Sequence, residues 1–236
     1  LNVGPLVVPL SRATFNNSNK KLYPQPPKLF SHNDQQSVWQ ASSPEGAREG
    51  WGGRIGDLMA SQNASSIFTC NSISGSAVFL AGQSTIAYQL SASGSTPIAG
   101  ISGSLFGSAS ASSNLRTIIT SGGANIFTQD LADTTQRSID ANVSLSAALA
   151  SAPDLPLPVD LAKSSLAARI ALGAKRQVFF VSLGGFDTHD NQLRDQPPLH
   201  AQVASAMAYF YNATVTLGVA DSVTSFTGSD FGRTLT

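Results

Sequence analysis

The 236-residue chain is 42% hydrophobic, which is enough to build the packed core of one large domain or two small ones. Lys plus Arg equals Asp plus Glu at 14 each, so zero net charge excludes a protein that binds nucleic acid or an anionic membrane by electrostatic attraction. Charged residues make up only 12%, a composition more typical of exported than of cytosolic proteins. We therefore expect a periplasmic or extracellular protein with no nucleic-acid partner and, since no apolar run approaches the ~20 residues required, no membrane span.

The first sixty residues predict a loop followed by two short helices. Pro24, Pro26 and Pro27 exclude a helix in the opening segment. The stretch SHNDQQSVWQ then predicts a helix whose N-cap is Ser31 or Asn33. The glycines of GWGGRIGDLMASQ predict a tight turn into a second helix, with one apolar face formed by Ile55, Leu58 and Met59.

The middle of the chain predicts a change from strands to helices. Residues 65–107 contain the short β-like runs SIFTCNSIS, AVFLAG and IAYQLS, which we interpret as strands of a small antiparallel or edge region. This region would be a β-rich insertion in a single domain that spans residues 1–236. Cys70, the only cysteine, lies in the first run and is expected to be a buried, inert thiol. Helices are predicted over residues 125–150 and 159–172, separated by the prolines of PDLPLP.

The last quarter predicts a βαβ unit. QVFFVSL, residues 177–183, has the continuous apolar character of a strand buried on both faces of a parallel sheet. A helix is expected after Pro197 and Pro198. Its apolar stripe consists of Leu199, Val203, Met207, Phe210 and Leu217. SVTSFT, residues 222–227, predicts a second strand parallel to the first.

Polar clusters follow both predicted strands of this unit. Asp187 and His189 come shortly after the first strand, behind two glycines, and Asp230 follows the second. The carboxyl ends of parallel strands meet at one sheet edge, and Asp oxygen with His nitrogen suits a divalent cation such as zinc or manganese. The same residues are also typical of an ordinary structure, in which Asp caps its own turn and His is a hydrogen-bonded structural residue.

Five segments, in this order along the whole chain, carry a resemblance to a known family. They are NVGPLVVPLSR, LFSHNDQQSVWQ, GWGGRIGDL, FFVSLGGFDTHDNQL and SDFGRTLT. Together they resemble an uncharacterised bacterial family of exported proteins, domain of unknown function 1501, which is placed in the alkaline phosphatase and sulfatase superfamily. The resemblance implies an alkaline-phosphatase-like α/β fold. In this fold a doubly wound, mostly parallel sheet carries helices on both faces, and we expect the small β region in addition.

The resemblance also implies a metal site, with departures from the superfamily pattern. Asp187 and His189 look like the Asp and His ligands of phosphatases, with a shortened spacing, and the Ser-Asp-His-Gly segment resembles residues 229–232. Phe231 stands where that segment has His, and an aromatic ring cannot bind a metal, so one ion site is lost or rebuilt. Family members usually carry further segments before NVGPL and after SDFGRT, so we expect the chain to be truncated at both ends. Either a signal segment has been removed or the chain is part of a longer protein.

Three further residues are candidates for substrate chemistry. Ser31, at a predicted helix start, is the first candidate nucleophile, because a helix N-terminus favours negative charge on an attacking oxygen. An ordinary N-cap serine has the same pattern. Arg54 and Arg233 could each bind a phosphate or sulfate oxygen pair, or tie down their own glycine-rich turns.

Two functions are consistent with these residues. The first is an exported metal-dependent hydrolase of phosphate or sulfate esters, with Asp187, His189 and Asp230 as ligands completed by groups outside the chain. The second is a non-catalytic secreted protein that keeps the hydrolase fold and binds polysaccharide or other copies of itself. The Asp-Thr-His cluster favours the first function, and Phe231 favours the second.

Overall fold

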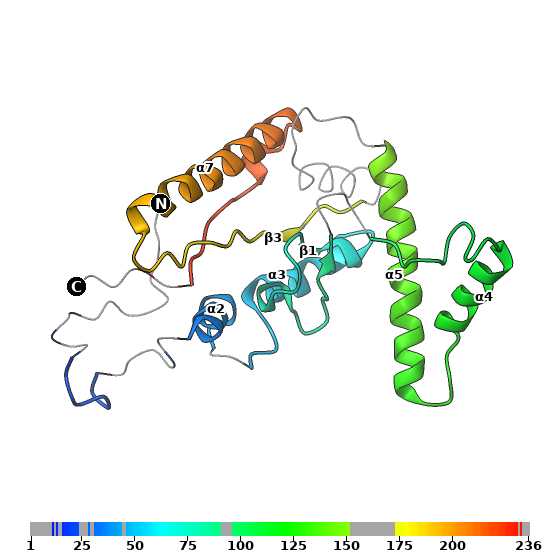
Figure 1. The fold of residues 1–236 in the computed structure, drawn as a ribbon, viewed down its shortest axis with the longest axis horizontal. Helices are drawn as coiled ribbons and strands as arrows, with labels where there is room; N and C mark the ends of the chain where they lie inside the picture. The colour runs from blue at the N-terminus through cyan, green and yellow to red at the C-terminus, as the bar shows by residue number, and fades with distance from the viewer. Residues whose placement is uncertain are drawn as a thin grey trace. The chain divides into compact units, whose positions relative to one another are not determined.

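The computed structural model describes residues 11, 13, 16–23, 28, 31–43, 46–90, 96–151, 173–230 and 232. Within these ranges the fold is mixed α/β, with five α-helices and a small three-stranded sheet (Figure 1). The chain divides into two compact units: residues 1–88, 176–182 and 221–236 form the first, and residues 89–175 with 183–220 form the second. No helix of the described part is both long and apolar enough to cross a bilayer.

The sheet joins two strands that lie more than a hundred residues apart in sequence. The strand order is β2 (Tyr88–Gln89), β1 (Cys70–Ser72) and β3 (Val178–Phe180), and β1 pairs with β3 in parallel, with Cys70 opposite Val178. The Asn63 side chain extends this pairing, because its Nδ2 donates to Arg176 O at 2.8 Å and its Oδ1 accepts from Arg176 N at 3.0 Å. A buried carboxamide thus satisfies the backbone where the chain enters β3.

Helix α2 (His32–Ala41) begins where the sequence predicts. Ser31 is its N-cap, and the Ser31 Oγ accepts from Asp34 N at 3.4 Å. The helix ends at Ser42, which has a left-handed φ of 57° and donates its N–H to Val38 O. A polar N-cap and a left-handed C-cap therefore bound the helix as the local sequence indicates.

The helix predicted in GWGGRIGDL is confirmed as α3 (Trp51–Met59), but only Gly50 precedes it, as its N-cap, and the other three glycines lie inside the helix instead of in a turn. Gly52, Gly53 and Gly56 are its buried residues, and a Cβ at Gly53 would lie 2.1 Å from Ala81 C and O. The predicted apolar face is also wrong in part, since Leu58 is 78% exposed. Helix α3 packs through bare backbone against the segment at residues 78–82, which only glycine permits.

An aromatic cluster fills the first unit. Buried Phe79 and Leu80 pack with Trp39, Trp51 and Phe180, and the Trp51 ring meets the Phe79 ring edge-on at 4.5 Å. Cys70 is completely buried beside them, as the sequence predicts. Burial and the negative charge of Asp57 raise the pKa of the Cys70 thiol to about 12. The thiol is therefore protonated at neutral pH, and only the thiolate form of cysteine is a nucleophile or a metal ligand.

The second unit is helical. Helix α5 (Ile126–Ser151) confirms the helix predicted over 125–150 and packs beside α4 (Ala109–Thr120), which the sequence reasoning missed (Figure 1). Helix α7 (Gln192–Thr216) begins before Pro197 and Pro198 instead of after them. Proline has a helical φ, but beyond the first turn each proline removes a backbone hydrogen bond and crowds the carbonyl four residues earlier, so local sequence rules favour a later start than the one observed. The five predicted stripe residues of this segment are all half-buried.

Several predicted strands are absent from the described residues. The AVFLAG run forms a 3-10 turn at Val78–Leu80, and residues 223–229 have no regular secondary structure, so the predicted βαβ unit does not form. Strand β3 covers three half-buried residues of the predicted 177–183, and its parallel pairing with β1 agrees with the parallel sheet predicted for this segment. The helix predicted over 159–172 lies outside the described residues.

Candidate functional site

Asp187 and His189 lie on the loop that leads into α7, within the second unit. The His189 Nε2 and Asp187 Oδ2 atoms are 3.1 Å apart, and the two side chains are 77% and 48% exposed. Gly185 has a φ of 95° and His189 a φ of 43°, so two left-handed residues bend this loop. Asp187 and His189 are therefore in contact with each other, and the pair faces solvent.

The loop is anchored by its neighbours. Thr188 N donates to Phe186 O at 2.9 Å, and Asn191 N donates to Thr188 O at 3.0 Å. The Phe186 ring packs edge-on against His200, with centroids 5.5 Å apart. His200, at the start of the predicted helix, thus packs on the loop and stays exposed. These contacts position Asp187 and His189 without involving their side chains.

The donor atoms of this pair fit a divalent cation. Tetrahedral zinc with bonds of about 2.0–2.2 Å separates two of its ligands by about 3.3–3.6 Å, whereas an octahedral ion with similar bonds separates neighbouring ligands by about 2.8–3.1 Å. The 3.1 Å between Asp187 Oδ2 and His189 Nε2 is shorter than the zinc separation and falls in the octahedral range. The same pair of atoms also makes a good hydrogen bond, so the geometry suits both predicted interpretations.

Asp230 lies in the first unit, against helix α2. Gln36 Nε2 donates to Asp230 Oδ2 at 2.9 Å, and Trp39 Nε1 donates to Oδ1 at 3.3 Å. The structure therefore brings Asp230 to the helix that Ser31 caps, joining two of the family-like segments across almost 200 residues. Gln36 and Trp39 were missed by the sequence reasoning, although their i, i+3 spacing places them on one face of a predicted helix.

The N-terminus of α2 contains a second carboxylate that was missed. Asp34 is 2% exposed and forms an ion pair with Lys28, with Nζ and Oδ1 3.2 Å apart. Ser31, the candidate nucleophile, uses its hydroxyl as the N-cap of this helix. The spacing of Ser31 and Asp34 is that of a capping box, which could have predicted both residues as a structural pair.

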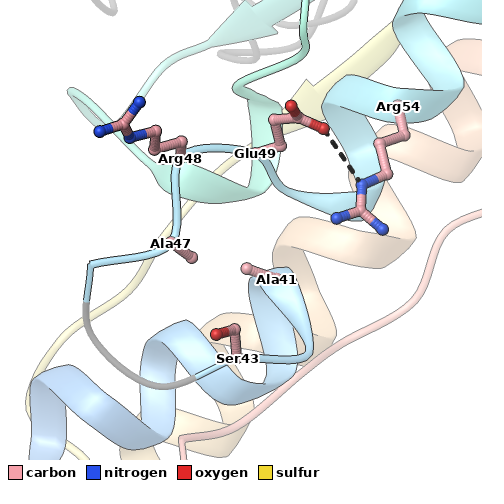
Figure 2. Close-up of a pocket in the computed structure, with 6 residues that line it drawn as sticks. All are labelled: Ala41, Ser43, Ala47, Arg48, Glu49 and Arg54. Atoms are coloured by element: carbon pink, nitrogen blue, oxygen red, sulfur yellow. Dashed lines mark ion pairs between the residues drawn. The ribbon is translucent and has the colours of Figure 1, made fainter.

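Arg54 lines an open pocket of about 250 Å³ in the first unit, formed by Ala41, Ser43, Ala47, Arg48, Glu49 and Arg54. Figure 2 shows the Glu49 carboxylate directed at Arg54, with Nε and Oε2 3.5 Å apart, while the Arg48 guanidinium extends away from both. The predicted substrate-binding arginine is therefore already paired with a carboxylate. Arg233 and Phe231 lie outside the described residues.

Metal-ligating side chains do not gather in threes anywhere in the described residues. Asp187 and His189 supply one oxygen and one nitrogen in the second unit, and Asp230 supplies a carboxylate in the first. The metal site therefore remains a prediction, with the contact between Asp187 and His189 as its structural basis.

Comparison with known families decides the identity at a coarse level. A family model described as "Protein of unknown function (DUF1501)" matches residues 17–236. The chain belongs to the DUF1501 family. No curated protein and no solved structure matches the chain. The DUF1501 assignment agrees with the resemblance that the sequence segments carry, and four of the five segments lie within the matched residues.

Proposed function

We propose that this DUF1501 protein is an exported metal-dependent hydrolase of phosphate or sulfate esters with an alkaline-phosphatase-like fold. The observation that carries the proposal is the Asp187–His189 pair, whose donor atoms lie 3.1 Å apart on an exposed, glycine-hinged loop. The parallel pairing of β1 with β3 supports the α/β part of the fold assignment. The low charge content supports export to the periplasm or outside the cell.

The residues have distinct roles in this proposal. Asp187 and His189 bind a divalent ion such as zinc or manganese, and Asp230 is the third predicted ligand. A bound ion would polarise the ester oxygen and favour attack by a hydroxyl group. Ser31 is the proposed nucleophile: its N-cap hydrogen bond of 3.4 Å is long, so the hydroxyl could leave it at little cost. Arg54 and Arg233 would bind the remaining ester oxygens as guanidinium groups do.

Metal analysis of the purified protein tests the proposal. We expect a near-stoichiometric divalent ion in the wild type and its loss in an Asp187→Asn, Asp230→Asn double variant, with Asp190→Asn as the exposed control on the same loop. Hydrolysis of phosphate and sulfate monoesters should follow the metal content and be absent in Ser31→Ala. A wild-type protein without metal, still folded by circular dichroism, would contradict the proposal.

A non-catalytic role is the second candidate. Two of the predicted site residues already have protein partners, which favours this role: Asp230 accepts hydrogen bonds from Gln36 and Trp39, and Arg54 pairs with Glu49. On this proposal the Ser- and Asn-rich surface binds polysaccharide or other copies of the chain. Retention on polysaccharide resins or concentration-dependent assembly in sedimentation, in a protein without metal, would favour this role over hydrolysis.

A further inference from the structure

One face of helix α5 is buried in its C-terminal half and exposed in its N-terminal half. Residues spaced alternately four and three positions apart share one face of a helix, as the a and d positions of a coiled coil do. In the C-terminal half this face is buried and consists of Ala141, Leu145 and Ala148. In the N-terminal half the same face continues as an exposed row, here called the open seam, which consists of Phe127, Leu131, Thr134 and Ser138.

The open seam carries two large apolar side chains in contact with water. Phe127 is 80% exposed and Leu131 is 65% exposed, and their i, i+4 spacing makes them neighbours on the helix surface. The buried side chains of this half, Ala132 and Ile139, project from a different side of the helix. The open seam is therefore a separate face, with an apolar patch of the kind that marks an interaction site.

Two copies of the open seam fit each other when the helices run antiparallel. A two-fold axis centred between Leu131 and Thr134 places these two side chains opposite each other across the pair. Phe127 then faces Ser138 of the second copy. Each large side chain meets a small one, so the layers of the pair can interdigitate.

The charges beside the open seam favour the same arrangement. Asp130 and Arg137 directly precede two seam residues, so both lie on one flank, at the heptad position whose charges set partner choice and orientation. Among the described residues the Asp130 side chain has no partner, and the Arg137 guanidinium donates only to Thr134 Oγ1, at 3.0 Å. In the antiparallel pair Asp130 of each copy meets Arg137 of the other. A parallel pair would instead place Asp130 beside the neutral Thr135.

We propose that the open seam is a self-association surface, at which two copies of this chain pair their α5 helices antiparallel about a two-fold axis. The pairing buries Phe127 and Leu131 and forms two equivalent ion pairs between Asp130 and Arg137. The seam is short, so the dimer should be weak, with a Kd on the order of 10 µM. This interaction goes beyond the proposed hydrolysis, and it gives association with other copies a defined surface.

Sedimentation velocity of the full chain between about 1 and 200 µM tests the surface. We expect a concentration-dependent dimer in the wild type. Leu131→Ala should weaken it about tenfold, because both copies lose apolar area from the interface. Val143→Ala is the matched control, since Val143 is 60% exposed on the same helix but lies off the seam, and it should sediment as the wild type does. Both positions are exposed, so neither change disturbs the core.

Charge exchange tests the antiparallel arrangement. Asp130→Arg and Arg137→Asp each place like charges opposite each other in the dimer, so each variant alone should dimerise about tenfold more weakly than the wild type. A mixture of the two variants should form a heterodimer, because each supplies the charge that the other lacks. The double variant carries both changes and should dimerise as the wild type does.

The outcomes separate this proposal from the hydrolase proposal. A wild type that stays monomeric up to about 200 µM would overturn the self-association, as would a dimer that Leu131→Ala leaves intact. A dimer insensitive to both charge reversals would refute the antiparallel pairing. Metal content and ester hydrolysis should be equal in the wild type and Leu131→Ala, so either proposal can fail while the other stands.

Discussion

Replacing Gly53 with alanine tests the packing of helix α3 against the segment at residues 78–82. In an exposed helix this substitution would raise stability by about 1 kcal/mol, because alanine is the better helix former. Here the new Cβ would lie 2.1 Å from Ala81 C and O and 2.4 Å from Gly82 N. These are backbone atoms, so no side chain can rotate to make room.

The cost follows from the distance that α3 must move. Ordinary contact begins near 3.4 Å, so the helix and residue 81 must separate by about 1.3 Å. The hydrogen bond from Gly50 N to Ala81 O, now 2.8 Å, cannot survive that shift. Overpacking of about 1–3 kcal/mol and a lost hydrogen bond of about 1 kcal/mol outweigh the gain in helix propensity. We expect Gly53→Ala to lower the free energy of unfolding by about 2 kcal/mol.

Urea unfolding followed by tryptophan fluorescence measures this, since Trp51 reports on the contact between α3 and Phe79. With a slope of about 2 kcal/mol per molar urea, the midpoint should fall by about 1 M. Gly184→Ala is the control, because a Cβ there meets nothing within 4 Å, and it should change stability by less than about 0.5 kcal/mol. A Gly53→Ala protein as stable as the wild type would refute the packing argument.

Three further predictions concern residues packed near α3 and the sheet. Asp57 accepts hydrogen bonds from Gln83 N, Ser84 and Thr85 N, which lower its pKa well below the usual range although partial burial opposes this. The stabilisation by the Asp57 carboxylate is therefore complete above the unfolded-state pKa near 3.9 and is lost as the pH falls below that value. Asp57→Asn should be about 2 kcal/mol less stable than the wild type at pH 7, and this difference should narrow in urea titrations below about pH 4. A difference that stays constant with pH would contradict this prediction. Cys70 should resist a disulfide exchange reagent at pH 8 in the native protein and react fully in denaturant, and fast native labelling would show that it is not buried. Asn63→Ala removes three hydrogen bonds, two of them to Arg176, and should lower stability by about 2–3 kcal/mol in the same assay, whereas exposed Asn33→Ala should not.

The helices were predictable where one local signal was sufficient. Ser31 marks the start of α2 by its own chemistry, and α5 forms over the predicted residues, although Leu131 and Val143 of its predicted apolar stripe are 65% and 60% exposed. The stripe from Leu199 to Leu217 is likewise the less exposed side of its segment. In each case a contact within a few residues of the chain determines the outcome.

Three of the predicted strand runs contain the strands β1, β2 and β3, whereas the other two failed because a strand needs a partner. AVFLAG and SVTSFT have the composition of strands, but the first forms a 3-10 turn beneath α3 and the second has no regular structure. A high β propensity means that a side chain packs well on a half-buried pleated surface. That surface exists only where the segment pairs with another strand. The three residues Val178–Phe180 became a strand because Cys70–Ser72 lies beside them.

The sequence by itself determined the chain's charge balance, the start of helix α2, its buried thiol and the short spacing between Asp187 and His189. Each of these depends on composition or on residues a few positions apart. Only the tertiary structure decided that three glycines of α3 form a packing face and that the Asn63 side chain hydrogen-bonds the backbone of Arg176. It also decided that Gln36 and Trp39 donate hydrogen bonds to Asp230. These contacts join residues that lie tens to hundreds of positions apart, and their existence depends on how distant segments pack, which no local pattern encodes.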